Sequence, residues 1–156
     1  MIPIVTIALP GLTLHPERPL APLEAAMFLL NQREDALLHA CEDGTLPWVW
    51  DIATPTSERR ELRILSESLT AIACQKPQPK YDDVEDVISE LVPHRDLKST
   101  ELQIFLTCSS THVSNLLRAG CLAAVAPRKA ESGVHSATWV RRDSVVEFLR
   151  SRRFVG

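Results

Sequence analysis

The sequence has 156 residues, of which 45% are hydrophobic and 24% are charged. These proportions are typical of one or two small globular domains and exclude a chain that is disordered throughout. No apolar run approaches the roughly 18 residues that cross a bilayer, and the first residues lack the basic region of a secretory signal. We therefore expect a cytoplasmic protein with no membrane partner.

The net charge of −3 averages over blocks of opposite sign. Residues 1–76 carry −4, residues 77–96 carry −4 and residues 97–156 carry +5. A basic block is the electrostatic signature of a surface that binds phosphates, and the acidic remainder is expected to face away from it. The overall acidity therefore does not exclude nucleic acid as a partner.

Cysteine and glycine patterns argue against a metal site, a cofactor and catalysis. The four cysteines show no C-x-x-C spacing, and each lies in an apolar context that suits a reduced core residue. The chain has no glycine-rich phosphate loop, G-x-S-x-G elbow or metal-spaced histidine pair. Cys108 and His112 have a spacing that a nucleophile and its base could use, but both fall within a predicted turn and helix that explain them without catalysis. We expect no enzyme.

The N-terminal segment PIVTIAL, residues 3–9, is rich in β-branched residues and predicts a strand. This strand could join the sheet of the first half or be exchanged between chains.

A polar, proline-bearing connector, QKPQPK at residues 75–80, predicts a domain boundary. The segment after it, YDDVEDVISELV, places apolar residues at helical spacing with acids on the opposite face, and Pro93 ends the helix. The apolar stripe consists of Val84, Val87, Ile88 and Leu91. It either packs between two domains or pairs with the same helix of a second chain.

Residues 100–119 predict two short helices joined by a tight turn at 107–110. The first helix buries Leu102, Phe105 and Leu106, and the second buries Val113, Leu116 and Leu117. Ser109 is placed to cap the second helix through its hydroxyl, and Gly120 lies where a helix end needs left-handed geometry.

The solvent face of the second helix is polar and contains no acid, which suits the major groove of DNA. This face consists of Ser110, Thr111, His112, Ser114, Asn115 and Arg118, with Ser109 at its start. Asn115 and Ser110 are the candidates for base-edge contacts, and Arg118 is a candidate phosphate contact.

Residues 125–140 predict a β-hairpin around a Glu-Ser-Gly turn at 131–133, with Arg128 and Lys129 on its first arm. These two residues are candidates for contacts with an adjacent backbone or minor groove. The following segment, TWVRRDSVVEFLRSRR, predicts a strand that runs into a helix capped by Asp143 or Ser144.

Five arginines near the C-terminal end are candidates for phosphate contacts. They are Arg141, Arg142, Arg150, Arg152 and Arg153. Trp48, Trp50 and Trp139 are expected to pack in the core or at the base of a hairpin rather than to stack on bases.

This C-terminal region resembles the excisionase and MerR-like family of winged helix-turn-helix DNA-binding domains. The resemblance rests on the apolar pair Phe105-Leu106, the turn Cys108-Ser109, the helix with Leu116-Leu117, and Gly120-Cys121-Leu122. It covers about sixty residues, and the arginine-bearing strand and final helix follow in the family's order. Thr107 departs from the pattern, because the family often has glycine there. The resemblance implies a prokaryotic or mobile-element protein that binds double-stranded DNA.

A single shift along the chain, without a gap, lays the apolar pattern of the first half over that of the second half. Leu30 falls on Leu106, Gly44 on Gly120 and Leu46 on Leu122. The shared apolar pattern and turn glycine imply a diverged second copy of the same module.

The first copy is acidic where the second is polar. Ser110, Thr111 and Arg118 correspond to Glu34, Asp35 and Glu42. Carboxylates facing phosphates are repelled, so this copy is expected to make a protein contact or to serve a structural role. Its loop and next strand retain Arg59, Arg60 and Arg63, which leave a minor wing-type contact open.

The sequence thus predicts a mainly α protein with small β-hairpin wings, an α+β tandem winged helix-turn-helix. Its divisions are an acidic module at 1–74, a linker and bridging helix at 75–96, and a basic module at 97–156. The predicted function is transcriptional regulation or recombination directionality through double-stranded DNA. The alternative is a protein-interaction adaptor. A homodimer or a protein partner is expected at the acidic module or the bridging helix.

Overall fold

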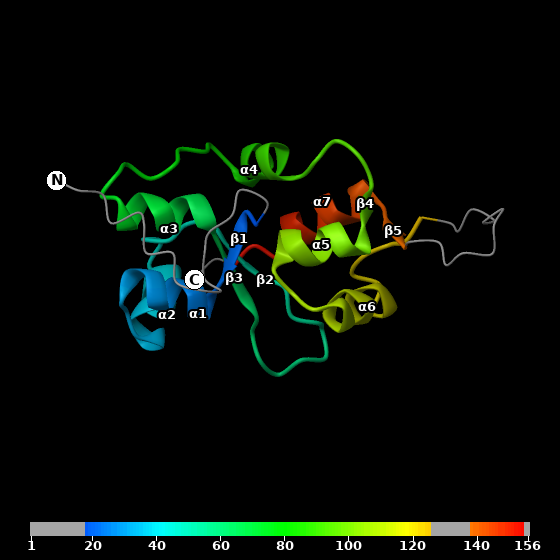
Figure 1. The fold of residues 1–156 in the computed structure, drawn as a ribbon, viewed down its shortest axis with the longest axis horizontal. Helices are drawn as coiled ribbons and strands as arrows, with labels where there is room; N and C mark the ends of the chain where they lie inside the picture. The colour runs from blue at the N-terminus through cyan, green and yellow to red at the C-terminus, as the bar shows by residue number, and fades with distance from the viewer. Residues whose placement is uncertain (1–17, 126–137, 155–156) are drawn as a thin grey trace.

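The computed structural model describes residues 18–125 and 138–154, and all structural statements below concern these residues. They form a mixed α/β protein with seven helices and two small antiparallel sheets (Figure 1). No helix among them is long and apolar enough to cross a membrane. The predicted strand at 3–9 and the wing residues Arg128 and Lys129 lie outside the described residues.

The first half contains three helices and a three-stranded sheet of order β1-β3-β2. Its elements are β1 (Leu20–Pro22), α1 (Leu23–Leu30), α2 (Glu34–Glu42), β2 (Val49–Asp51), β3 (Leu62–Leu65) and α3 (Ser66–Ala73). The remainder contains α4 (Val84–Leu91), β4 (Leu97–Lys98), α5 (Ser99–Leu106), α6 (Ser110–Arg118), β5 (Trp139–Val140) and α7 (Arg142–Ser151). The strands β4 and β5 pair antiparallel.

The elements of the first half recur in the second half. Each is displaced along the chain by the distance in sequence from Leu30, the last residue of α1, to Leu106, the last residue of α5. The helices α1 and α2 match α5 and α6 at all four bounds under this offset, and the start of α3 matches the start of α7. The strand pairing follows the same offset, since Pro22 pairs with Arg63 and Lys98 pairs with Trp139. The repeat that the apolar pattern indicates is therefore present in the structure. We call residues 18–74 the first repeat and residues 97–154 the second repeat.

The turns of the two repeats share the same unusual backbone geometry. Asn31 ends α1 at φ 50°, and Thr107 ends α5 at φ 49°. Gly44 and Gly120 follow α2 and α6 at φ 85° and 81°. Left-handed geometry is costly for most residues with a side chain, so its recurrence at two equivalent positions supports the repeat independently of the sequence pattern.

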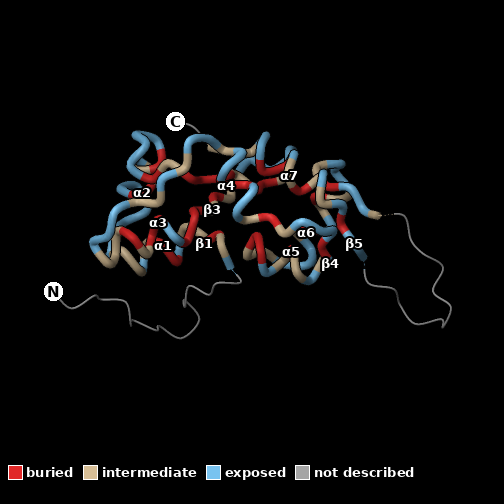
Figure 2. Tube along the Cα trace, turned by 90° about the horizontal axis from the view of Figure 1, so that it is seen from above, coloured by how far each residue is buried: buried red, intermediate tan, exposed pale blue. Residues whose placement is uncertain are grey.

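The buried core crosses the boundaries predicted from the sequence. One apolar cluster joins the second repeat and α4 to Leu20, Trp50, Ile52 and Leu65 of the first repeat. A smaller cluster lies within the first repeat and is covered in part by Phe154 at the chain's end. Buried segments accordingly run through the middle of the molecule from one repeat into the other (Figure 2). The two repeats therefore share the larger of the two apolar clusters.

The bridging helix packs within the chain, against α7 and into the apolar cluster that both repeats share. Asp83 caps α4 by accepting a hydrogen bond from the amide of Asp86 at 3.0 Å. Val87 and Ile88 are buried in the shared cluster. On the exposed side, Glu85 binds Arg150 of α7 through two hydrogen bonds.

The predicted cap of the last helix is wrong. The helix α7 begins at Arg142, with Arg141 as its N-cap residue, rather than after Asp143 or Ser144. A residue distant in sequence explains the earlier start, because Asp96 accepts a hydrogen bond from the amide of Arg142 at 2.9 Å. This carboxylate satisfies a free N–H of the first turn, which a local cap would otherwise do.

Candidate nucleic-acid interface

The helix α6 carries most of the site residues predicted from the sequence. Ser109 caps it as expected, because its hydroxyl accepts a hydrogen bond from the amide of His112 at 3.1 Å. Val113 and Leu116 bury the opposite face, and Gly120 ends the helix with left-handed geometry. The exposed residues on or beside this helix include Ser109, Ser110, Thr111, Ser114 and Arg118, and Asn115 is half-buried.

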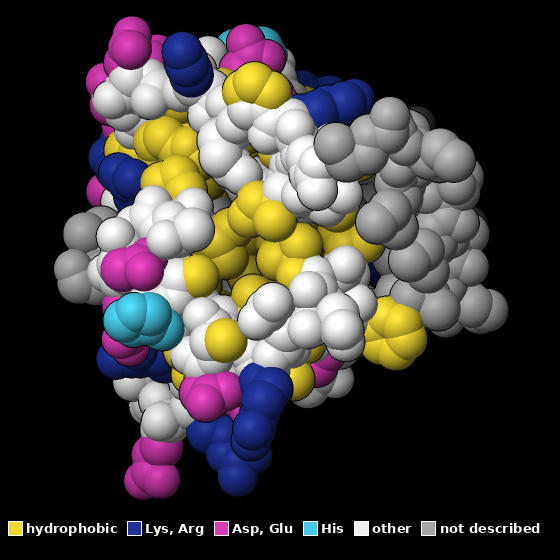
Figure 3. All heavy atoms as spheres, turned by 90° about the vertical axis from the view of Figure 1, so that its left-hand side faces the viewer, with side chains coloured by type: hydrophobic (Ala, Val, Ile, Leu, Met, Phe, Trp, Pro, Cys, Tyr) yellow, Lys and Arg dark blue, Asp and Glu magenta, His cyan; other side chains and the backbone are white. Residues whose placement is uncertain are grey.

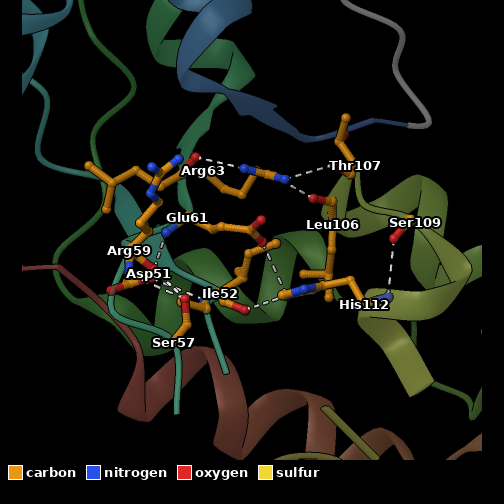
Figure 4. Close-up of polar contacts among 12 residues, drawn as sticks. Asp51, Ile52, Ser57, Arg59, Glu61, Arg63, Leu106, Thr107, Ser109 and His112 are labelled. Carbon is orange, nitrogen blue, oxygen red and sulfur yellow. Dashed lines mark hydrogen bonds and ion pairs between the residues drawn. The ribbon is translucent and has the colours of Figure 1, made fainter. Parts of the chain in front are cut away.

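The side chain of His112 turns away from this exposed face and toward the first repeat. It is only 15% exposed, and its Nε2 lies 2.6 Å from the carbonyl oxygen of Ile52 and 3.3 Å from Oε2 of Glu61 (Figure 4). The carbonyl requires that Nε2 carry a proton in this contact. His112 therefore belongs to the junction between the repeats and not to the exposed face of α6.

The turn before α6 is also fixed to the first repeat. The guanidinium of Arg63, in β3, donates to the carbonyl oxygens of Leu106 at 2.8 Å and Thr107 at 3.0 Å (Figure 4). The hydroxyl of Thr107 donates to the carbonyl oxygen of Leu20 at 2.8 Å. These bonds satisfy carbonyls that the end of α5 leaves free. Arg63 thus holds the turn and is not available as a wing-type contact.

Most of the C-terminal arginines that were predicted to contact phosphates instead bind other groups of the same chain. Arg150 binds Glu85 and Glu147, and Arg142 donates to the carbonyl oxygen of Pro93 at 2.9 Å. Arg152 donates to the carbonyl oxygen of Ala53 at 3.0 Å.

Arg153 completes this set, because it lies 4.2 Å from the ring centre of Trp48 and donates to Pro47. The backbone beside it extends the sheet of the first repeat, since the amide of Phe154 donates to Val49 at 2.8 Å. Arg152 and Arg153, directly after α7, therefore fasten this part of the chain to the first repeat. Arg118 and Arg141 are exposed and stay candidates for phosphate contacts.

The equivalent helix of the first repeat exposes carboxylates. Glu34, Asp35, Glu42 and Asp43 are all exposed on or directly after α2. Hydrogen bonds from Thr45 lower the pKa of Asp43, so its charge persists into acidic solution. This face has the charge expected of a surface that DNA avoids.

The tryptophans differ from one another in exposure. Trp48 and Trp50 are buried as predicted, and the indole of Trp50 donates to the carbonyl oxygen of Leu149 at 3.0 Å. Trp139 is 39% exposed on β5, with the ammonium of Lys98 5.3 Å from its ring centre.

The thiol of Cys108 and the ring of His112 lack the features of an activated pair. Burial raises the pKa of Cys108 to about 11, which keeps the thiol protonated near neutral pH. The His112 ring faces Ile52 and Glu61. Within the described ranges, no group of three or more His, Cys, Asp or Glu side chains could hold a metal ion.

Comparisons with protein-family models, with curated proteins and with solved structures found no match.

Proposed function

We propose that this protein binds double-stranded DNA through α6, as a tandem winged helix-turn-helix of the excisionase and MerR-like kind. The observation that carries the proposal is the exposed face of α6, where Ser110, Thr111, Ser114 and Arg118 form a polar surface without acids. Short hydroxyl side chains and one cation match the hydrogen-bonding edges and phosphates of a major groove.

The fixed junction between the repeats supports the same proposal. Arg63, Thr107 and His112 tie the turn and the first residues of α6 to the first repeat. A recognition helix needs such a fixed orientation, because base-edge contacts depend on distance and angle. The first repeat would then orient α6 while its own acidic α2 faces away from DNA.

The number of free cations limits the expected affinity. Arg118 and Arg141 would supply phosphate contacts from the described residues, with Arg128 and Lys129 expected beside them from the sequence. A small number of neutralised phosphates gives modest affinity with a shallow salt dependence. The biological role would be transcriptional regulation or control of recombination direction.

The experiment is fluorescence anisotropy of the full chain on random duplex DNA at low and moderate salt. Binding that weakens as salt rises supports the proposal. Absence of binding even at low salt favours the second candidate, an adaptor that binds protein. The observation that favours the adaptor is Phe28, which is 55% exposed on α1, the helix that precedes the acidic α2.

A further inference from the structure

Two different surfaces meet where the repeats touch. The first, which we call the edge surface, lies on the sheet and loop of the first repeat. It consists of Leu20, Ile52, Glu61 and Arg63. The second, which we call the turn surface, lies around the turn between α5 and α6 and consists of Leu106, Thr107 and His112. Since the surfaces differ, the contact is of the head-to-tail kind.

Because the elements repeat, each repeat carries a version of both surfaces. In the first repeat, the positions equivalent to Leu106, Thr107 and His112 are Leu30, Asn31 and Ala36, and they form its turn surface. The described edge surface of the second repeat includes Asp96 and Trp139, which occupy the positions of Leu20 and Arg63. Figure 1 shows α1 and α2 at one end of the long axis and β5 at the opposite end.

The exposed large hydrophobic residues lie on or beside the turn and edge surfaces. Among the described residues they are Phe28 at 55%, Ile104 at 37% and Trp139 at 39%. Phe28 and Ile104 are equivalent residues close to the ends of α1 and α5, and Trp139 stands where Arg63 stands in the first repeat. Ile104 lines a groove together with Arg63 and Thr107, so this position borders the contact inside the chain.

Exposed charges of opposite sign lie beside the two outer surfaces, and the carboxylate of Asp96 on the edge surface is occupied by its bond from the amide of Arg142. Glu34 and Asp35 are exposed at the start of α2, where Asp35 also lies 3.9 Å from Arg33. Lys98, over the ring of Trp139, and Arg141 are exposed at the opposite end. Figure 3 views the end that holds α1 and α2 and shows apolar side chains in the middle of that face with charged ones around them.

We propose that this chain associates head to tail with copies of itself, through the same kind of contact that joins its own repeats. Trp139 of one chain packs beside Phe28 and the α1–α2 turn of the next, and Lys98 and Arg141 face Glu34 and Asp35. Two aromatic side chains that leave water together are the usual energetic centre of such an interface. The proposal does not depend on DNA binding.

The test is sedimentation velocity of the full chain without DNA, across a range of protein concentrations. The wild-type protein should shift to larger species as concentration rises, and Phe28→Ser and Trp139→Ser should each stay monomeric. Ile104→Ser is the matched control, because its position already borders the contact inside the chain, and it should associate like the wild type. A wild-type chain that stays monomeric at every concentration would overturn the proposal.

A mixing experiment identifies the geometry. Each variant retains one intact surface, so Phe28→Ser and Trp139→Ser chains mixed in equal amounts should form a dimer that grows no further. A symmetric contact between two Phe28 faces would instead let Trp139→Ser dimerise alone, and that result would also overturn the proposal.

Charge reversal provides a second measurement, because Glu34, Asp35, Lys98 and Arg141 are all exposed. The double variant Glu34→Lys/Asp35→Lys should stay monomeric alone and should associate when mixed with Lys98→Glu/Arg141→Glu. Loss of association without this rescue would contradict the proposed pairing. Circular dichroism of each variant shows that the fold is retained.

Discussion

Arg63 of the first repeat donates a hydrogen bond to the carbonyl oxygen of Thr107, at the turn that precedes the proposed recognition helix, over 3.0 Å. Its second bond reaches Leu106, and burial lowers the pKa of the guanidinium, which nevertheless stays charged at neutral pH. One side chain thereby joins the sheet of the first repeat to the helix pair of the second. The proposed recognition helix is thus oriented by a repeat whose own equivalent helix, α2, exposes acidic residues.

Arg63→Ala should lower the free energy of unfolding by about 2–3 kcal/mol, because it removes hydrogen bonds from a charged donor and leaves two carbonyls unpaired. Urea unfolding followed by tryptophan fluorescence measures the loss. Arg59→Ala, on the exposed loop of the same repeat, is the matched control and should change stability by less than about 0.5 kcal/mol. Equal effects of the two substitutions would show that the junction contact contributes nothing.

Glycine at the two equivalent turn positions should have different effects on stability. Asn31→Gly should stabilise the chain by up to about 1 kcal/mol, because glycine adopts the left-handed φ of 50° without steric cost. Thr107→Gly also gains steric relief but loses the bond from the Thr107 hydroxyl to Leu20, so it should be neutral or destabilising. Thermal unfolding of both variants distinguishes them, and stabilisation by both would contradict the role given to the Thr107 hydroxyl.

The stability of the second repeat should depend on the charge of Glu101. Hydrogen bonds from Arg95 and from the amide of Lys98 lower the pKa of this carboxyl from 4.5 to about 2. A lowered pKa in the folded state adds stability above the unfolded-state value, and that stability is lost as pH falls through the folded-state value. The difference in stability between the wild type and Glu101→Gln should therefore be largest above about pH 4.5 and shrink toward pH 2.

The control for this measurement is Glu58→Gln, on an exposed loop. A difference for Glu101→Gln that stays constant across this pH range would contradict the assigned bonds.

Residues 97–156 should not fold when separated from the rest of the chain. Their core includes Trp50, Ile52 and Leu65 from the first repeat, and Val87 and Ile88 from α4. Removal of these partners exposes a large part of the apolar surface that stabilises the second repeat. Circular dichroism and amide-proton dispersion measure the outcome. A cooperative unfolding transition of the fragment would show that the shared core is dispensable.

The local elements could be predicted from the sequence, and their long-range contacts could not. Patterns of neighbouring residues predict four of the features seen in the structure. These are the internal repeat, the cap at Ser109, the left-handed glycine at position 120 and the bridging helix. Such patterns report the face and the ends of a helix, because these depend on the residues within a few turns.

The contacts between repeats depend on side chains that are far apart in the sequence. His112 and Arg152 appear in the sequence as polar residues free to meet DNA, yet their partners are Ile52, Glu61 and Ala53 of the first repeat. The cap of α7 cannot be predicted for the same reason, since Asp96, directly before β4, accepts the hydrogen bond from the amide of Arg142. No local pattern reports a hydrogen bond to a backbone carbonyl in a distant part of the chain.

The most direct test compares two equivalent exposed positions on the helices α6 and α2. Arg118→Glu and Glu42→Arg change charge by the same amount in opposite directions, at matching positions of the two repeats. Anisotropy of full-length variants on duplex DNA at low salt gives the affinities. If α6 enters the groove, Arg118→Glu should weaken binding strongly, and Glu42→Arg should leave it unchanged or raise it slightly. Equal loss of affinity in both variants would contradict the account.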